Sequence, residues 1–398
     1  MQNSILSVLD KIGRAALVSA PLLALAFTAM QTGRAQTYTV LYTFTGGPDG
    51  GTPMDTPILF NGNVYGTTEG GGAKAAGAVY ELNFKSRHEV ALHSFSGADG
   101  SGPIGGLVQG KNGNFYGAAY HGGGHNDGAL FELTPAGQFT LLHSFAGPPT
   151  EGMGPAGTPV FDSLGDLFGT TYVGGASKGW GTVYEYTAAG VFETGQSFSP
   201  DGALPRAGLF FQAGKLYGTT CGCGYLPYGG TIYEVGVQRA LYTFSGGADG
   251  SQPLASLVGD GAGNLYGTTS AGGIGSFGAG AGVIFKFNLS TSELTVLHTF
   301  SGPDGAVPAA GLAWDAQGNL YGTTTLGGAH GYGNVFKLDS SGNLTSLHDF
   351  TGGADGASPY AGVLVDSKGN VWGAAAAGGS AAAPGGYGVI FIISPPTT

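Results

Sequence analysis

The chain has 398 residues, of which 80 are glycine and only 10% are charged, and its formal net charge at pH 7 is -11. This acidic balance, with no basic stripe along the sequence, argues against nucleic-acid binding, because phosphate backbones attract clustered Lys and Arg. The 42% of hydrophobic residues predicts a folded core in spite of a glycine content that is otherwise typical of disordered chains.

The N-terminal segment, residues 1–35, has the layout of a secretory signal peptide. Lys11 and Arg14 precede an apolar run, residues 15–30, and small residues then lead to Ala35, after which cleavage is predicted. The alternative is an uncleaved membrane anchor, but the run is shorter than the roughly 20 residues that a membrane-spanning helix needs. The sequence therefore predicts an exported mature chain without a membrane span, located outside the cell, in the periplasm or in the cell envelope.

The rest of the chain repeats one phrase about every 50 residues. It reads Gly-Asn-Leu-Tyr-Gly-Thr-Thr at residues 263–269 and has seven versions in all. The other six lie at residues 63–68, 114–119, 166–171, 215–220, 319–324 and 370–375. A period of this length is typical of β-propellers and solenoids, which are built from copies of one structural unit.

Two further anchors recur in step with this phrase. One is a strand-like run that ends in phenylalanine, and the other is an apolar residue followed by an aromatic one. The phenylalanines are Phe44, Phe95, Phe145, Phe198, Phe244, Phe300 and Phe350. The pairs are Val79-Tyr80, Leu130-Phe131, Val183-Tyr184, Ile232-Tyr233, Ile284-Phe285, Val335-Phe336 and Ile390-Phe391. Because all three features keep the same order, the sequence predicts seven equivalent units.

Each unit reads as four short β-strands separated by turn residues. In the sixth unit the predicted strands are residues 310–314, 319–324, 334–338 and 344–350. Four-stranded units repeated around a ring form a β-propeller, whereas an open solenoid normally has a shorter period.

The two ends of the repeat region favour a closed ring. Residues 37–44 match the fourth strand of a unit, while residues 389–393 match the third. Pairing them would complete the last blade and leave no exposed strand edge there. We therefore predict an all-β protein, a seven-bladed β-propeller of four-stranded blades over residues 36–398, closed by pairing of its N-terminal strand with the last blade.

The units resemble the tandem GloVer (Gloeo/Verruco) repeats of exported bacterial proteins. The resemblance rests on the Gly-Asn-Leu-Tyr-Gly-Thr-Thr phrase, on the glycine pairs that follow it, and on Leu-His-Ser-Phe at residues 92–95 and 142–145. The glycine pairs include Gly174-Gly175, Gly272-Gly273 and Gly327-Gly328. The resemblance covers residues 37–393 and implies an exported propeller, but it brings no established activity and no catalytic residues.

The loops that follow the second and fourth strands of each unit emerge on one face of the ring, because neighbouring strands are antiparallel. We call this the loop face. The loops after the second strand vary most in length and content, which predicts that the loop face binds the ligand. Aromatic residues in these loops are candidates for contact with a carbohydrate or an extracellular protein. They are Trp180, Tyr225, Tyr228 and Tyr332.

Every loop after a fourth strand also carries an acidic residue. These residues are Asp49, Asp99, Glu151, Asp201, Asp249, Asp304 and Asp355. Such a ring could accept hydrogen bonds from sugar hydroxyls, or hold a cation such as calcium, around the channel mouth. The alternative is a structural role, since Asp-Gly is favoured in tight turns through side-chain hydrogen bonds. The sequence has no EF-hand or other compact calcium loop, and no cofactor is expected.

Two local patterns are also open to a functional interpretation. His121 and His125 are spaced like metal ligands, but the three glycines between them oppose a helix, and zinc would need a further ligand such as Asp127. Cys221 and Cys223, the only cysteines, form either a strained disulfide or two free thiols. Their spacing differs from the C-x-x-C of redox enzymes.

Four histidines lie in the fourth strands of different units, at His93, His143, His298 and His348. Equivalent units carry Tyr42, Tyr242 and Gln196 instead. Because tyrosine would abolish a shared imidazole chemistry, we expect a packing role at this position rather than catalysis.

Together these patterns favour a non-catalytic binding or scaffold protein, expected to be a monomer. The alternative is a hydrolase or lyase that acts on extracellular polysaccharide with carboxylates at the channel mouth. An enzyme should break the sevenfold pattern with a cluster of unlike ionisable groups, whereas the units read as nearly uniform. The sequence also lacks a G-x-S-x-G elbow, a phosphate-binding loop of the Walker type and an H-E-x-x-H motif.

Overall fold

The computed structural model describes residues 36–176, 179–199, 202–222, 229–273, 280–380 and 385–396. The predicted signal peptide lies outside these residues, as do Asp201, Cys223, Tyr225 and Tyr228. The described part of the chain forms β-strands and contains no α-helix. It therefore offers no helix that could cross a membrane.

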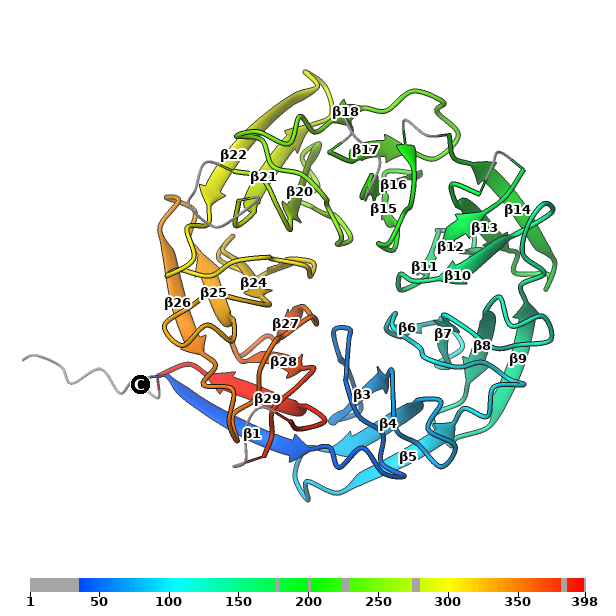
Figure 1. The fold of residues 1–398 in the computed structure, drawn as a ribbon, viewed down its shortest axis with the longest axis horizontal. Helices are drawn as coiled ribbons and strands as arrows, with labels where there is room; N and C mark the ends of the chain where they lie inside the picture. The colour runs from blue at the N-terminus through cyan, green and yellow to red at the C-terminus, as the bar shows by residue number, and fades with distance from the viewer. Residues whose placement is uncertain are drawn as a thin grey trace, which may run out of the picture. The chain divides into compact units, whose positions relative to one another are not determined.

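Residues 38–394 form seven antiparallel sheets around a common centre (Figure 1). In blades 1 to 6 the four blade strands follow their order along the chain from the centre to the rim, and in blade 7 the outermost strand is β1. Blade 1 contains β2 (Ile58–Phe60), β3 (Asn63–Thr68), β4 (Ala78–Asn83) and β5 (Glu89–Ser94). Blade 2 contains β6 (Val108–Gln109), β7 (Phe115–Ala119), β8 (Ala129–Leu133) and β9 (Phe139–Ser144). Blade 3 contains β11 (Val160–Phe161), β12 (Leu167–Gly174), β13 (Thr182–Tyr186) and β14 (Phe192–Ser197).

The remaining blades repeat this arrangement. Blade 4 contains β15 (Phe210–Gln212), β16 (Lys215–Thr220), β17 (Thr231–Glu234) and β18 (Tyr242–Thr243). Blade 5 contains β19 (Val258–Gly259), β20 (Asn264–Thr269), β21 (Val283–Asn288) and β22 (Glu293–Thr299). Blade 6 contains β23 (Ala313–Trp314), β24 (Leu320–Thr324), β25 (Asn334–Leu338) and β26 (Leu344–Asp349). Blade 7 contains β27 (Val363–Val365), β28 (Val371–Ala375), β29 (Val389–Ser394) and β1 (Thr37–Thr43).

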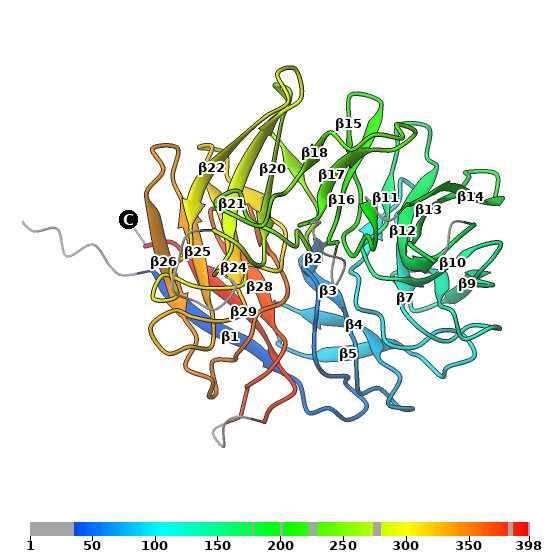
Figure 2. The ribbon, with the colours of Figure 1, turned by 45° about the horizontal axis from the view of Figure 1, so that its top comes forward.

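The ring is closed as predicted, by the first strand of the described chain. β1 is the outer strand of blade 7, whose order is β1-β29-β28-β27. The two strands lie side by side in both views (Figures 1 and 2), and the Phe44 N–H donates to the Gly388 carbonyl at 3.0 Å just beyond them. The outer edge of β29 is thus covered by a segment from the other end of the chain.

Two details differ from the predicted strands. In blade 6 the innermost strand begins at Ala313 rather than at residue 310, because the preceding residues line a central cavity instead of pairing. Blade 3 has a fifth strand, β10 (Gly152–Pro155), which pairs with an extended β12. Other blades make the same contact as a single bridge, such as Ser251 with Ala271.

The second glycine of the repeated phrase makes room for an aromatic ring on the neighbouring strand. Gly267 lies opposite Phe285, and a Cβ at Gly267 would come within 2.7 Å of that ring. The same opposition recurs in the other blades as Gly66 with Tyr80, Gly117 with Phe131, Gly169 with Tyr184, Gly218 with Tyr233, Gly322 with Phe336, and Gly373 with Phe391. Two of the sequence anchors are therefore two sides of one contact.

In five of the seven blades the first threonine of the phrase bonds to the next blade; blades 2 and 7 have Ala118 and Ala374 at this position. Thr268 donates its hydroxyl hydrogen to the Ala310 carbonyl of the following blade at 3.1 Å. The same bond runs from Thr67 to Gly105, from Thr170 to Ala207, from Thr219 to Ala255, and from Thr323 to Ala361. The acceptors all lie in the stretch that enters the next blade, so these bonds also fix the wall of the centre.

Aromatic pairs fill the seams between blades. Each phenylalanine that follows an outer strand is at most 4% exposed. Each packs edge-on or tilted against the aromatic residue of the next blade, with ring centroids 4.8–5.6 Å apart. This spacing is favourable for aromatic side chains, so the third anchor supplies the core between blades.

Candidate functional site

The acidic residues of the loop face bond to their own turns. Asp304 accepts hydrogen bonds from the backbone N–H and the hydroxyl of Ser301, both at 2.8 Å, and lies 2.8 Å from Nε2 of His298 on β22. Burial by itself would raise the pKa of Asp304, but these bonds outweigh it and leave that pKa below its usual value. Equivalent turn bonds hold Asp49, Asp99, Glu151, Asp249 and Asp355.

These carboxylates therefore lie beside the outer strands, away from the centre of the ring. None of the six that the structure describes lines the central cavity. Asp201 lies outside the described residues. The geometry fits the turn-stabilising interpretation, since each described carboxylate already has donors from its own loop.

The same contacts explain why histidine and tyrosine alternate on the outer strands. His93, His143, His298 and His348 each place Nε2 2.8–3.0 Å from the carboxylate of the following loop. Tyr42 and Tyr242 donate their hydroxyl hydrogens to Asp49 and Asp249 at 2.9 and 3.0 Å. Either side chain can donate to the carboxylate, so exchange between them keeps the bond.

The aromatic residues predicted for ligand contact serve partly as covers for the loops. Tyr332 is 36% exposed, and its ring lies over Gly352, where a Cβ would come within 2.7 Å of it. Trp180 forms a β-bridge with Gly174 in blade 3, as Tyr332 does with Gly327 in blade 6. Its side chain is partly buried against the cluster that contains Phe198. With Tyr225 and Tyr228 outside the described residues, contact between this set and a ligand stays a prediction.

The two local patterns give no further site in the described part of the chain. There, no three His, Cys, Asp or Glu side chains lie close enough to hold a metal ion. His121 packs its ring against Tyr120, with centroids 4.6 Å apart. Cys221 is fully buried beside Ala203 and Leu204, and because Cys223 lies outside the described residues, the disulfide stays a prediction.

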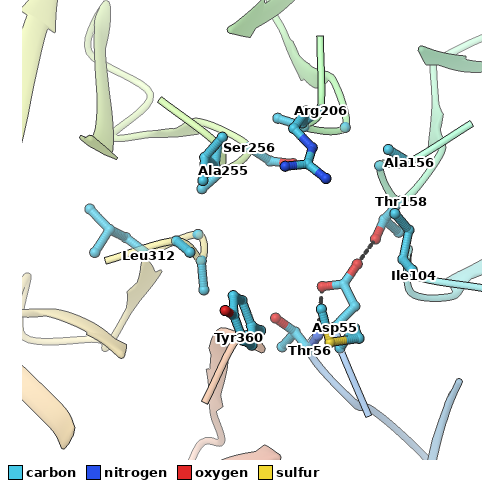
Figure 3. A pocket seen from close by; sticks show the side chains of 18 of the residues that line it. Asp55, Thr56, Ile104, Ala156, Thr158, Arg206, Ala255, Ser256, Leu312 and Tyr360 are labelled. Atoms are coloured by element: carbon cyan, nitrogen blue, oxygen red, sulfur yellow. Dashed lines mark hydrogen bonds between the residues drawn. The ribbon is translucent and has the colours of Figure 1, made fainter. Parts of the chain in front are cut away.

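A cavity of about 320 Å³ lies at the centre of the ring and is lined from all seven blades (Figure 3). Each blade contributes residues from the stretch that follows a proline in its incoming loop. The prolines are Pro53, Pro103, Pro155, Pro205, Pro253, Pro308 and Pro359. Because these stretches lead from the loop face into the innermost strands, the cavity lies at the mouth of the channel on that face.

Polar side chains enter the cavity wall where the repeat is broken. The residue directly after the proline is aliphatic or Met in five units but is Arg206 in blade 4 and Tyr360 in blade 7. The next residue is Gly or Ala in six units and Asp55 in blade 1, and the third position includes Thr158 and Ser256. We call these five side chains the mouth cluster. Figure 3 shows them around one space, although they come from five different blades.

Asp55, in blade 1, is hydrogen-bonded to residues of blades 2 and 3. It accepts hydrogen bonds from the Gly106 N–H at 2.5 Å, from the Thr158 hydroxyl, and from the Thr56 N–H at 2.6 Å. Withdrawal from bulk water raises the pKa of Asp55, and these hydrogen bonds only partly oppose that effect. The carboxyl group is therefore held in one orientation and takes up a proton more readily than an ordinary aspartate.

Arg206 is the cationic member of the mouth cluster. It lies next to Tyr172 and Tyr120, which we call the aromatic strip. Its guanidinium carbon lies 5.1 Å from the centre of the Tyr172 ring, a cation–π distance. The Tyr120 ring lies 6.5 Å from that of Tyr172. Both tyrosines directly follow the repeated phrase, in blades 2 and 3, where the other five blades have Glu69, Cys221, Ser270, Thr325 and Ala376.

Sequence reasoning treated the units as nearly uniform and so missed the mouth cluster. Aligning the seven stretches on their proline would have exposed it, because an aspartate then replaces a small residue and an arginine replaces an apolar one. What that alignment does not show is that these positions converge on one cavity, since they are about 50 residues apart along the chain.

Seven four-stranded blades around a central cavity define a closed seven-bladed β-propeller. The chain belongs to the Gloeobacter/Verrucomicrobia repeat family, whose sequence profile matches residues 28–160, 138–279 and 229–398. This match confirms the resemblance seen in the repeated phrase. A search of the curated proteins found no match.

Solved structures share the fold at low sequence identity. A chain of the mitotic checkpoint complex is 13% identical with a TM-score of 0.56, and the match covers 94% of this chain and 96% of that one. The extracellular domain of a one-component system protein from B. thetaiotaomicron is 12% identical with a TM-score of 0.51, covering 90% of this chain and 40% of that one. A protein from Bacteroides uniformis, titled a 6-phosphogluconolactonase, is 17% identical with a TM-score of 0.50, covering 79% and 90%. At such identities these likenesses show the fold alone.

Proposed function

We propose that this protein is an exported carbohydrate-binding propeller that holds a sugar unit in the cavity at the channel mouth. The observation that carries the proposal is the mouth cluster. In a ring of otherwise small and apolar residues, a carboxyl group, hydroxyl groups and a guanidinium converge on one cavity. Such a mixture of fixed donors and acceptors suits sugar hydroxyls, which both donate and accept hydrogen bonds.

The volume of the cavity and the exposed aromatic ring of Tyr360 agree with a small polar ligand. Its volume of about 320 Å³ is at the lower end of the range for ligand pockets, so it suits one sugar ring or the end of a glycan chain. Tyr360 is 43% exposed there and offers an aromatic ring to the apolar side of a sugar. The predicted signal peptide supports a location outside the cytoplasm, where polysaccharides are met.

Binding is favoured over hydrolysis by the number of carboxylates at the site. The raised pKa of Asp55 would suit a general acid. Glycosidases, however, generally use two carboxylates that flank the scissile bond. Among the described residues that line the cavity, Asp55 is the only carboxylate.

The test is glycan-array screening of purified residues 36–398, followed by titration calorimetry with the best ligand. Tyr360→Ala and Asp55→Ala should each weaken binding at least about tenfold, because they remove a ring contact or a fixed acceptor. Tyr332→Ala is the matched control, since Tyr332 is an exposed tyrosine of the loop face that does not line the cavity.

The reverse result, loss of binding in Tyr332→Ala with Tyr360→Ala unaffected, would move the site to the outer loops. Circular dichroism should show that each variant is folded. Turnover of a polysaccharide that Asp55→Asn abolishes would replace the binding proposal with the hydrolase or lyase alternative.

A further inference from the structure

Arg206 is a cation to which the described residues offer no hydrogen-bond acceptor, in a protein of net charge -11. No carboxylate, hydroxyl or carbonyl of the described residues accepts a hydrogen bond from its guanidinium, and no ion pair holds it. Its guanidinium carbon lies 5.1 Å from the centre of the Tyr172 ring. The residue is exposed and lines the cavity at the channel mouth.

From this arrangement we infer that the sugar carries a carboxylate, as a uronic acid does, and that Arg206 binds it. The inference rests on the function proposed above and narrows its ligand to acidic glycans. An arginine presents five N–H donors in a planar fork that fits the two oxygens of a carboxylate. The cation–π contact with Tyr172 supports the plane of the guanidinium without using those donors.

The position of Asp55 agrees with this assignment. Its two oxygens are engaged by Thr158, the Gly106 N–H and the Thr56 N–H, which draw the carboxylate into the wall. Asp55 and Arg206 line the same cavity but form no ion pair with each other. The donors in the cavity wall thus keep the Asp55 carboxylate from pairing with Arg206. The guanidinium is therefore available to bind an anionic group of the ligand.

The aromatic strip gives an acidic glycan a path to the cavity. Tyr120 and Tyr172 lie on the loop face in adjacent blades, with ring centroids 6.5 Å apart, and Arg206 follows in the next blade. Aromatic rings next to a cation suit alternating contact with the faces of sugar rings and with their carboxylates. A chain of uronic acid residues could therefore lie over both tyrosines and end in the cavity.

The experiment compares three probes by titration calorimetry with residues 36–398. They are an oligogalacturonate, the same oligomer as its methyl ester, and a neutral galactan fragment of equal length. We expect the oligogalacturonate to bind at least about tenfold more tightly than the other two, and the difference to shrink as salt is added.

Arg206→Gln should remove this preference by weakening the binding of the oligogalacturonate alone, at least about tenfold. Arg206→Lys should keep part of the preference. Arg239→Gln is the control, since Arg239 is an exposed arginine that does not line the cavity and should leave all three affinities unchanged. Equal binding of the acidic and neutral probes, or no effect of Arg206→Gln, would overturn the inference. If Tyr360→Ala still abolished binding in that case, the proposed function would stand; if none of the glycans bound, both would fall.

Discussion

At the scale of single residues, the turn carboxylates show how a repeated acidic residue can be structural. Asp304 is bonded to Ser301 and faces His298, and the other described turns use the same geometry with His or Tyr as the donor. A ring of seven carboxylates in a sequence therefore need not be a ring of ligands.

The outer-strand donor can be tested by exchange. His298→Phe should lower the free energy of unfolding by about 1–3 kcal/mol, because it leaves a partly buried carboxylate without one of its donors. His298→Tyr should lose much less, since Tyr242 makes the same contact in the preceding blade. Urea unfolding followed by tyrosine and tryptophan fluorescence measures both. Equal losses in the two variants would show that the hydrogen bond to Asp304 contributes nothing.

Glu89 on β5 should make stability depend on pH. Burial, and secondarily the charge of Asp49, raises the pKa of Glu89 to about 7, although a hydrogen bond with Tyr42 opposes the shift. A carboxyl whose pKa is higher in the folded chain stabilises the fold at acid pH, and this contribution is lost as the pH rises towards 7. Glu89→Gln should therefore be more stable than the wild type above pH 7, by on the order of 1 kcal/mol after allowance for solvent screening.

The comparison needs an exposed glutamate at the start of another outer strand. Glu293 begins β22 as Glu89 begins β5. It is exposed and lies one position before Leu294, the equivalent of Glu89. Glu293→Gln should shift the unfolding free energy by the same small amount at every pH between about 5 and 8. This range spans the pKa of Glu89, which is about 7. A Glu89→Gln curve parallel to the wild-type curve over this range would contradict the assignment.

At the scale of the strand, the repeated phrase encodes one packing unit. Gly267 leaves the space that the Phe285 ring fills, and the neighbouring Thr268 bonds to the next blade. Gly267→Ala should destabilise the protein by about 1–3 kcal/mol, because the added methyl group overpacks the contact.

A double-mutant cycle separates this steric effect from a change in backbone flexibility. Phe285→Leu vacates part of the ring volume, so the double variant should lose less stability than the sum of the two single losses. Strict additivity in thermal or urea unfolding would mean that the two residues do not compete for the same space.

At the scale of the whole molecule, closure depends on β1. Removing residues 36–44 would leave the outer edge of β29 unpaired and would take Leu41 and Phe44 out of a buried cluster. Since exposed strand edges pair with other chains, the truncated protein should unfold at lower temperature and form oligomers in size-exclusion chromatography.

Adding the missing strand as a peptide should reverse this defect. A synthetic peptide with the sequence of residues 37–44 is expected to bind the truncated protein and restore the monomer, whereas a scrambled peptide should not. A truncated protein that remains monomeric and equally stable would show that the ring does not need this strand.

The sequence by itself determined the architecture, because every unit repeats the same structural pattern. The phrase, the phenylalanine and the apolar–aromatic pair recur seven times, and each proves to be one side of a contact within or between blades. The end strands matched different positions of a unit, so closure through β1 and β29 could also be predicted. Periodicity is informative here because local pattern and global packing repeat together.

Only the tertiary structure decided where the candidate site lies. Asp55, Arg206 and Tyr360 are single departures from the repeat, each three units from the next along the chain, and nothing near them in sequence marks them as neighbours. The ring brings them to one cavity because equivalent positions of all blades meet at its centre. The acidic residues of the turns recur in every unit and are therefore conspicuous in the sequence. In the structure, those that are described accept hydrogen bonds from their own turns and from the outer strands, at the rim of the ring.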